Sequence, residues 1–491
     1  MDISEIRRQN PWWENPLRIE EDLKIQDVEN SIAKWTPRLL HYIDLEKDAL
    51  YSIRGPRQVG KTTSIKILIK KLLINKNPIN IMYYACDLVL DEKKLYELLE
   101  SYHIWIRNQN QERIYIFLDE ISSVKNWQKT LKFFIDTKGN SNITFLVTGS
   151  HTLDIKSSTE RLPGRVGDKE GIQTNKILLP MKFAEYVEMR NPEIFEHIKK
   201  LDLHKSNTRN DEFLQIISGK LPKSSWNLSK ILPELDKLLE EYLITGGIMI
   251  AVNDYLKNSK ISASIYELYL KQLAGDIGRL NREEKTAKLI LLSMMKRMST
   301  PISWDGIRKE NGIANSQTIF QYANLLSDLF IINIFYKINL DNQHKKLSDK
   351  KIYIQNPFIF HALYNWLINP SKEPFVSTHE FLSDSQQKST LIESVIANHL
   401  CRATFSLKPS DIFDASDHIF YTRTKKGHEI DFVIKVDEKL RGIEVKYQNS
   451  INPEDFISLK KLQSGCLITK SLIEQRGRYS LIPISLFLLY I

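Results

Sequence analysis

The apolar positions in the N-terminal third of the chain fall into short runs that alternate with longer segments of helical spacing. A short, nearly continuous apolar run is typical of a parallel strand that is buried on both faces. A helical segment such as 127–138 can then connect one strand to the next. The alternation predicts a doubly wound α/β fold with a parallel sheet. The candidate strands are residues 50–53, 79–85, 114–118 and 143–147.

A phosphate-loop pattern, G-x-x-x-x-G-K-[ST], lies between the first candidate strand and the helical segment that follows it. Its glycines let backbone N–H groups surround phosphate oxygens, and the helix N-terminus adds positive potential. We expect Lys61 to reach the β- and γ-phosphates and the Thr62 hydroxyl to ligate Mg²⁺. The pattern predicts ATP or GTP binding, and the expected cofactors are ATP and Mg²⁺. The residues expected to contact the nucleotide are Gly55, Pro56, Arg57, Gln58, Val59, Gly60, Lys61, Thr62 and Thr63.

Polar residues follow the third and fourth candidate strands. Asp119 and Glu120 come directly after 114–118, and Thr148 comes directly after 143–147. Because the carboxyl ends of parallel strands face the phosphate loop, we expect Asp119 to hold Mg²⁺ and Glu120 to polarise the attacking water as a general base. The Thr148 hydroxyl can sense the γ-phosphate. With the phosphate loop, these residues predict a site that hydrolyses the nucleotide.

These motifs resemble those of the archaeal and bacterial AAA-type ATPases that carry a C-terminal domain of unknown function of the DUF4143 type. The resemblance implies a P-loop AAA+ sheet with Thr148 as sensor, in a homo-oligomeric ring, with a hexamer as one form, or in a regulated monomer. It also implies that Arg165 is an arginine finger acting on a neighbouring subunit's γ-phosphate. From the residues alone, a solvated loop arginine is the alternative. The resemblance rests on residues 55–63, 117–120, 147–150, 164–165 and 179–186.

The middle of the chain predicts a helical lid followed by a winged helix. Residues 232–273 have helical apolar spacing, broken at 245–247, and should cover the nucleotide, whereas the polar stretch 205–211 predicts a mobile loop. Beyond residue 281, the pattern predicts three helices and then a hairpin. The helices are expected at 281–298, at 304–310 and from an N-cap at Ser316 to about residue 329, and the hairpin strands at 331–340 and 351–355.

Two features of the expected winged helix suit nucleic acid. Gln317, Gln321 and Asn324 share the exposed face of the third helix, where amides can contact base edges or phosphates in a major groove. The tip of the hairpin, residues 343–351, is basic. We therefore expect DNA binding here. The alternative is that the amides face only solvent and that the unit serves as a rigid lid or a protein contact.

A set of acidic residues with a lysine marks the C-terminal part of the chain. A hairpin centred on residues 437–438 would place Asp431 opposite Glu444, with Lys446 on the same face as Glu444. Such a cluster can hold a divalent ion that activates water, with Glu393 from a preceding helix completing the metal shell. The pattern resembles the PD-(D/E)xK nuclease superfamily, although Ile430 stands where a proline often precedes the first acid. The resemblance implies a restriction-endonuclease-like α/β domain, active as a nuclease or only binding its substrate.

Composition sets the remaining bounds. The chain has 491 residues, 42% of them hydrophobic, and a net charge of +9 that is compatible with an anionic partner. Neither a membrane-spanning run nor a signal-peptide core is found, so we expect a cytoplasmic protein without a membrane partner. Three cysteines without a CxxC pair argue against a disulfide framework or a structural zinc site. The expected domains are an ATPase core at 1–190, a helical lid at 191–280, a winged helix at 281–365 and the nuclease-like domain at 366–491.

Three functions remain open at this point. The first is a Mg²⁺-dependent AAA+ ATPase that acts on DNA and couples hydrolysis to movement of the winged helix and the nuclease-like domain. The second is an ATP-regulated signalling or defence switch with protein partners. The third is a metal-dependent DNA nuclease gated by ATP.

Overall fold

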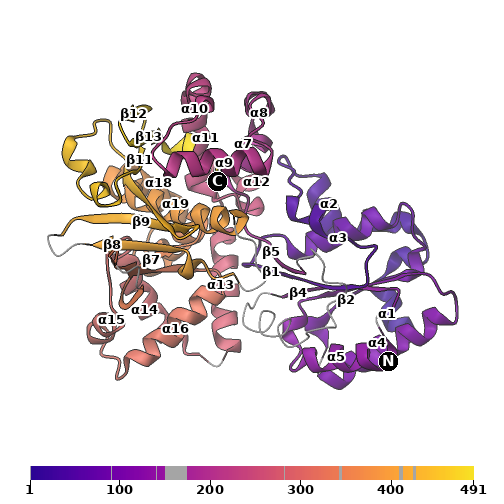
Figure 1. Cartoon of the computed structure of the whole chain (residues 1–491). Helices are drawn as coiled ribbons and strands as arrows, with labels where there is room; N and C mark the ends of the chain where they lie inside the picture. The colour runs from indigo at the N-terminus through magenta and orange to yellow at the C-terminus, as the bar shows by residue number, and fades with distance from the viewer. Residues whose placement is uncertain are drawn as a thin grey trace. The chain divides into compact units, whose positions relative to one another are not determined.

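The computed structural model describes residues 2–89, 91–139, 141–149, 174–280, 282–341, 345–407, 413–423 and 427–491. The chain divides into two compact units, Met1–Leu179 and Pro180–Ile491, whose elements are labelled in Figure 1. The finer division into four domains stays a prediction. No helix in the described ranges is long and apolar enough to span a bilayer.

The first unit is built around a five-stranded sheet in the order β2-β3-β4-β1-β5. All neighbouring strands run parallel. Nearly every strand residue is buried, which explains the continuous apolar runs in the sequence. This sheet confirms the predicted α/β fold with a parallel sheet. The strands are β1 (Ala49–Arg54), β2 (Ile81–Ala85), β3 (Ile114–Asp119), β4 (Ile143–Gly149) and β5 (Asn175–Ile177).

Helices cover both faces of this sheet. Helix α3 (Lys61–Leu72) lies on one face and packs against side chains such as Tyr83 and Phe117. Helices α4 (Glu92–Arg107) and α5 (Trp127–Lys138) lie on the other face, as Figure 1 shows. Successive strand residues point to opposite faces, so each strand contributes to both cores.

The N-terminal segment fastens to the outer edge of β2. The Asn10 side chain accepts a hydrogen bond from the Tyr83 N–H at 2.7 Å and donates to the Tyr83 carbonyl at 2.9 Å. Both indole N–H groups of Trp12 and Trp13 donate to the Ile81 carbonyl, and the Gln9 side chain accepts from the Ala85 N–H. The segment contains α1 (Ile3–Arg8), the 3₁₀ turns Pro11–Trp13, Pro16–Glu21 and Arg38–Tyr42, and α2 (Leu23–Glu29).

The second unit begins with a group of helices. The predicted mobile loop at 205–211 is wrong, because these residues form the first turns of α9 (Ser206–Ile217). Phe213, Ile216 and Ile217 of this helix are buried, and Ser480 donates a hydrogen bond to the Ile216 carbonyl, so tertiary packing decides the structure here. The other helices are α7 (Phe183–Arg190), α8 (Pro192–Lys200), α10 (Lys223–Leu228), α11 (Leu232–Thr245), α12 (Met249–Asn258) and α13 (Ala263–Arg279).

Three helices and a hairpin follow in the expected order. They are α14 (Glu284–Lys296), α15 (Trp304–Glu310), α16 (Ser316–Asp328), β6 (Ile332–Ile338) and β7 (Lys345–Ile354). The N-cap of α16 is Asn315, whose side chain accepts from the Gln317 N–H, rather than the expected Ser316. Ile302, just before α15, forms an antiparallel bridge with Lys350.

The hairpin β6–β7 is the end of an eight-stranded sheet in the order β12-β13-β11-β10-β9-β8-β6-β7. The prediction of a basic hairpin tip reaching Lys351 is therefore wrong in part, since Lys350 and Lys351 lie within β7 and are each 1% exposed. Their neighbours in the sheet and in α15 bury them. The remaining strands are β8 (Ile419–Arg423), β9 (Glu429–Val436), β10 (Lys439–Lys446), β11 (Gly465–Thr469), β12 (Glu474–Arg476) and β13 (Tyr479–Pro483).

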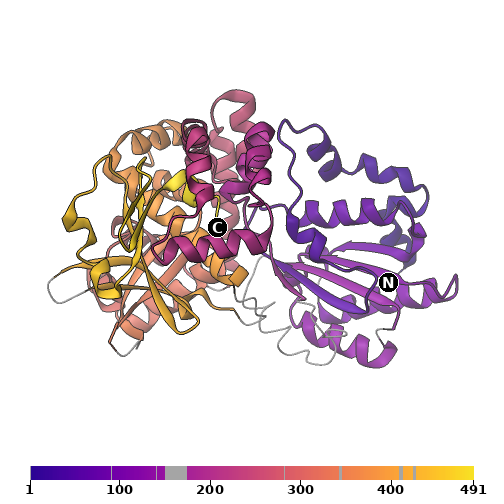
Figure 2. The same ribbon diagram turned by 45° about the horizontal axis from the view of Figure 1, so that its top comes forward.

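Helix α19 (Ser385–Leu407) packs against β7 and β8 of this sheet. Figure 2 shows it in orange beside the yellow strands. The hairpin β9–β10 turns at Asp437 and Glu438, as predicted, and both residues have positive φ values. Helices α17 (Pro357–Leu367), α18 (Pro374–Ser383) and α20 (Ile484–Phe487) complete the unit.

Candidate nucleotide site and acidic pocket

The phosphate loop connects β1 to α3 and needs glycine at two places. A Cβ on Gly55 would lie 2.0 Å from the Leu178 carbonyl oxygen, which no side chain can tolerate. Gly60, the N-cap of α3, has φ 94°, a conformation that favours glycine. The loop thus brings its backbone to the N-terminus of a helix, where N–H groups without helical partners can bind an anion.

Lys61 begins helix α3 and its side chain turns back over the loop. Its Nζ donates to the carbonyl oxygens of Gly55 at 2.9 Å and Pro56 at 3.0 Å. The side chain is buried, so this charge needs acceptors close by. Phosphate oxygens above the loop would be stronger acceptors than these carbonyls, because hydrogen bonds between charged partners are the strong ones.

The Asp119 carboxylate is the centre of the site. Its Oδ2 accepts a hydrogen bond from Thr62 Oγ1 at 2.7 Å and another from the Tyr83 hydroxyl at 3.1 Å. Its Oδ1 accepts from the Thr148 hydroxyl. The structure therefore brings together Thr62, Asp119 and Thr148 as the sequence predicts. A carboxylate and a hydroxyl oxygen side by side are the ligands that Mg²⁺ prefers, so these residues fit the expected ion.

Glu120 is held beside this centre in a strained conformation. Its φ of 49° lies in the left-handed region, which is uncommon for a residue other than glycine and concentrates at functional sites. Its N–H donates to Thr148 Oγ1 at 3.0 Å, and its Oε1 lies 3.6 Å from Arg57 Nη1 of the phosphate loop. The Thr148 hydroxyl thus contacts both the Asp119 carboxylate and the Glu120 backbone. Arg165, the predicted arginine finger, and Ser150 of the sensor motif lie outside the described residues.

Tyr83 is a site residue that the sequence analysis missed. Burial, and then the charge of Asp119, raise the pKa of its hydroxyl, so the group stays a donor. The same ring lies under the Lys66 ammonium at 3.4 Å, and Lys66 also pairs with Asp22 of the N-terminal segment at 3.1 Å. Tyr83 is the middle residue of the buried strand β2, where a polar side-chain atom is unusual. That signal becomes useful only once β2 is known to lie beside β3.

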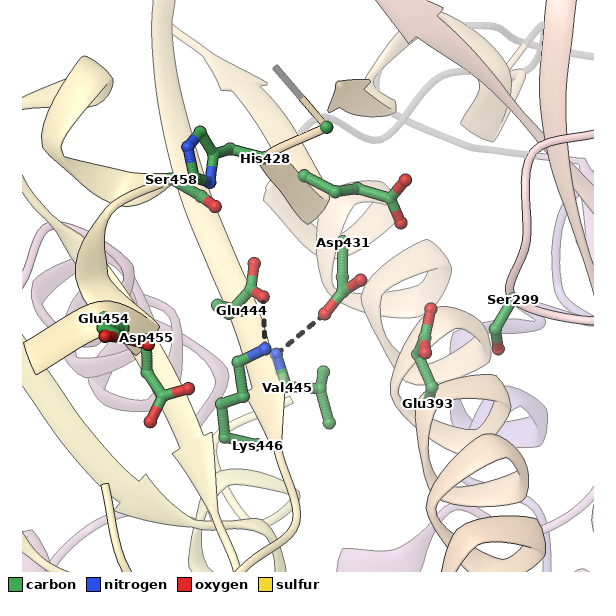
Figure 3. Close-up of a pocket in the computed structure, with 12 residues that line it drawn as sticks. Ser299, Glu393, His428, Asp431, Glu444, Val445, Lys446, Glu454, Asp455 and Ser458 are labelled. Carbon is green, nitrogen blue, oxygen red and sulfur yellow. Dashed lines mark hydrogen bonds and ion pairs between the residues drawn. The ribbon is translucent and has the colours of Figure 1, made fainter. Parts of the chain in front are cut away.

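A second candidate site lies in the C-terminal sheet. Asp431 and Glu444 face each other from β9 and β10, and the Val445 N–H donates to Asp431 Oδ2 at 3.0 Å (Figure 3). Glu393 approaches from α19. The predicted set of Glu393, Asp431, Glu444 and Lys446 thus comes together. The pocket has a volume of about 470 Å³ and is lined by Ser299, Glu393, Gly427, His428, Glu429, Asp431, Glu444, Val445, Lys446, Glu454, Asp455 and Ser458.

A residue that the sequence analysis assigned to the hairpin tip lies at the base of this cluster. The Nζ of Lys351 is 2.5 Å from Glu429 Oε1, 3.0 Å from Asp431 Oδ1 and 3.4 Å from Glu393 Oε1. The Tyr353 hydroxyl also donates to Glu393 Oε1, at 2.5 Å. Burial opposes the charge of Lys351, but Tyr353 and the carboxylates outweigh it and raise its pKa. Lys351 is therefore an ammonium ion surrounded by carboxylates.

Burial raises the pKa values of two acids on the pocket wall. Burial raises the pKa of Glu393 to about 7 and raises that of Glu444 as well. Lys446 donates to Glu444 Oε1 at 3.0 Å, whereas Glu444 Oε2 is buried without a hydrogen-bond partner among the described residues. No group of three or more His, Cys, Asp or Glu residues in the described ranges is arranged to hold a metal ion. Because Lys351 and Lys446 already donate to Glu393, Asp431 and Glu444, this cluster does not fit the expected nuclease metal.

Three family models match separate parts of the chain. Residues 47–187 match an AAA domain, residues 236–369 match a domain of unknown function (DUF8612), and residues 388–487 match another (DUF4143). The match at 47–187 includes the phosphate loop and the Asp119 centre. Residues 47–187 are similar to an AAA domain. The predicted likeness to AAA-type ATPases with a DUF4143-type C-terminal part is confirmed.

Two proteins of Methanocaldococcus jannaschii are similar in sequence to this chain. Uncharacterized protein MJ1637 of Methanocaldococcus jannaschii is 32% identical over 148 residues, which are 30% of this chain and 29% of that protein. Uncharacterized protein MJ1544 of the same organism is 25% identical over 427 residues, 84% of this chain and 78% of that protein. The match to MJ1637 thus spans less than a third of that relative, about the size of the AAA domain.

Three solved structures match this chain at low sequence identity and low TM-score. The Walker-type ATPase PABY2304 of Pyrococcus abyssi has a TM-score of 0.39 and 13% identity, covering 70% of this chain and 95% of that one. The ORC1 protein of Aeropyrum pernix in complex with DNA has a TM-score of 0.29 and 12% identity, and the match covers 75% of this chain and 98% of that one. The RuvB Holliday junction branch migration motor of Thermotoga maritima has a TM-score of 0.23 and 17% identity, and the match covers 58% of this chain and 81% of that one.

The raised pKa of Glu393 gives a pH dependence of stability outside the AAA domain. Folded Glu393 keeps its proton up to about pH 7, whereas the unfolded chain releases it at lower pH, so stability falls as the pH rises between these values. Glu393→Gln imitates the protonated acid. We expect wild type to lose about 1–3 kcal/mol relative to this variant between about pH 5 and 7.

Calorimetric melting of both proteins across this pH range measures the difference. Glu438→Gln, at a largely exposed glutamate in the turn between β9 and β10, is the matched control and should follow wild type. Parallel pH profiles of wild type and Glu393→Gln would contradict the prediction.

Proposed function

We propose that the protein is a Mg²⁺-dependent ATPase of the AAA+ class that binds DNA and couples ATP hydrolysis to movement of its C-terminal unit. The observation that carries the ATPase proposal is the set of hydrogen bonds around Asp119. Thr62 from the phosphate loop, Thr148 from β4 and Tyr83 from β2 all donate to this one carboxylate. These donors fix the acid beside the phosphate loop, where it can hold the Mg²⁺ of a bound nucleotide, usually through water.

The residues of the site have separate tasks in this proposal. Bound Mg²⁺–ATP supplies an electrophilic γ-phosphorus whose charge is partly neutralised. Lys61 exchanges the carbonyls of Gly55 and Pro56 for phosphate oxygens, and Thr62 and Asp119 orient the ion. Glu120 orients the attacking water and takes its proton. Thr148 holds Asp119 and the Glu120 backbone together and can report the γ-phosphate to both.

A homo-oligomer, with a hexamer as one form, is part of the same proposal. The support is the resemblance of the Gly164-Arg165 dipeptide to the finger motif of AAA-type ATPases. An arginine from one subunit would then stabilise transition-state charge at the neighbour's γ-phosphate.

Two substitutions separate binding from hydrolysis. We expect Lys61→Ala to weaken ATP binding, because the loop loses the ammonium that contacts the β- and γ-phosphates in this proposal. Glu120→Gln should bind ATP normally and reduce turnover by about 10²-fold or more, since the general base is lost. Nucleotide titration and steady-state phosphate release check these outcomes. Wild-type turnover in Glu120→Gln would remove Glu120 as the base.

Tyr83 should act as a positioning residue for Asp119. Tyr83→Phe removes one donor to the carboxylate that orients the ion, so the Mg²⁺ concentration needed for half-maximal ATPase rate should rise by about tenfold. The rate should recover at high Mg²⁺. Tyr84→Phe, whose ring belongs to the core on the other face of the sheet, is the control. An unchanged Mg²⁺ dependence in Tyr83→Phe would assign that hydroxyl to packing alone.

The proposed DNA contact lies on α16, in a three-helix and hairpin arrangement that we interpret as a winged helix. Ile319, Ala323 and Leu326 are buried on one side of α16, while Gln317 and Gln321 are exposed on the other. The exposed amides form the stripe that the sequence predicts, with Asn324 at its partly buried end. A net charge of +9 favours an anionic partner for the chain as a whole.

The DNA contact can be tested by adding negative charge to this stripe. The double variant Gln317→Glu/Gln321→Glu should weaken duplex binding about tenfold or more and reduce ATPase stimulation by DNA, because two carboxylates would face phosphates. Gln386→Glu/Gln387→Glu, at two exposed positions of α19, adds the same two charges and controls for net charge. Salt-dependent binding and ATPase rates with single-stranded, duplex and branched DNA are measured together. Equal binding by all variants would contradict the contact.

A specific observation supports a second function, a nucleotide-regulated switch with protein partners. Lys350 and Lys351 are buried in β7 and cannot serve a DNA-binding wing. If DNA neither binds in a salt-sensitive manner nor changes the ATPase rate, this second function replaces the first.

A further inference from the structure

The acidic pocket has the acidic residues of a metal-dependent nuclease, but a lysine side chain lies among them. In such a nuclease, acids hold divalent ions that activate water. Here three acids, Glu393, Glu429 and Asp431, have an oxygen within 3.4 Å of the Lys351 ammonium. Lys351 comes from β7, outside the expected boundaries of the nuclease-like domain.

Hydrogen bonds occupy both carboxylate oxygens of Asp431 and Oε1 of Glu393 and of Glu444, which a metal between these acids would need. Asp431 Oδ1 accepts from Lys351 and its Oδ2 accepts from the Val445 N–H. Glu393 Oε1 accepts from both Lys351 and Tyr353. Glu444 Oε1 accepts from Lys446. A divalent ion between Glu393 and Asp431 would therefore have to displace these donors and would lie close to a buried like charge.

We propose that Lys351 is a built-in counter-ion that takes the place of the divalent cation in this cluster, so that the pocket binds neither Mg²⁺ nor Mn²⁺ and does not cleave DNA. Six carboxyl groups and one ammonium, that of Lys446, line the pocket. Without a metal, this lining repels a phosphodiester backbone. This inference does not depend on the proposed ATPase activity.

The same lysine has a mechanical role. Adjacent strand residues point to opposite sides, and Lys350 lies 4.1 Å from the ring of Trp304 in α15 while Lys351 faces the acids. Glu393 belongs to α19, and Glu429 and Asp431 belong to β9. Strand β7 is thus held to the three-helix group on one side and to α19 and β9 on the other. The helices α14–α16 and the C-terminal sheet are joined as one body rather than hinged at the hairpin.

Mn²⁺ binding to the full-length, nucleotide-free protein tests the proposal. Electron paramagnetic resonance of free Mn²⁺ measures how much ion the protein removes from solution. Wild type and Asp431→Asn should remove the same small amount. Lys351→Met keeps the aliphatic stem and removes the ammonium, so it should bind Mn²⁺ about tenfold more tightly than wild type, and adding Asp431→Asn should abolish the gain.

Each result decides the question. Stronger Mn²⁺ binding by wild type than by Asp431→Asn would overturn the proposal, and so would a folded Lys351→Met variant that gains no binding. Wild-type nucleotide binding shows that Lys351→Met is folded; if it is not, the comparison of wild type with Asp431→Asn stands alone. Mn²⁺-dependent DNA cleavage that is lost in Asp431→Ala or Lys446→Ala would also overturn the proposal.

Discussion

A charge that leaves water must find an opposite charge or several hydrogen-bond partners within a few ångströms, and this constraint organises both candidate sites. In the first unit, the Lys61 ammonium lies on two loop carbonyls, and Lys66 lies between Asp22 and the ring of Tyr83. In the second, Lys351 is surrounded by three carboxylates. Removing one partner from such a buried group typically costs about 3–5 kcal/mol.

The surroundings of Lys61 and Lys351 differ in how easily each lysine can change its partners. Two acceptors of Lys61 are the neutral carbonyls of Gly55 and Pro56, which are weaker acceptors than phosphate oxygens. The partners of Lys351 in the acidic pocket are buried acids that would be left uncompensated if it moved. An anionic ligand therefore competes with weaker acceptors at Lys61 than at Lys351.

The nucleotide site could be predicted because its signals are local. Asp119 and Thr148 stand at the carboxyl ends of buried strands, and Thr62 belongs to the phosphate-loop motif that follows another. The rule that parallel strands end at one edge brings the three residues together before any coordinates are known. Tyr83 could not be found in this way. Its hydroxyl reaches Asp119 only because β2 is the neighbour of β3, and strand order is a tertiary property.

The acids of the acidic pocket could be predicted from the sequence, but the contact of Lys351 with them could not. Asp431, Glu444 and Lys446 belong to one hairpin whose turn is visible in the sequence, so their register follows from alternation. Lys351 stands at the end of a run of charged residues that is typical of a solvent-exposed turn. Its partners Glu393 and Asp431 are 42 and 80 residues away, and only the continuation of β6–β7 into the larger sheet brings them together.

The side chains that line the outer edge of β2 protect this edge from pairing with a strand of another chain. Gln9, Asn10, Trp12 and Trp13 hydrogen-bond to the outward-facing backbone groups of Ile81, Tyr83 and Ala85, so they imitate a neighbouring strand without forming one. An open edge of this kind is a template for pairing with other chains. During synthesis the N-terminal segment is made well before β2, and the growing chain therefore carries the cover for this edge before the edge exists.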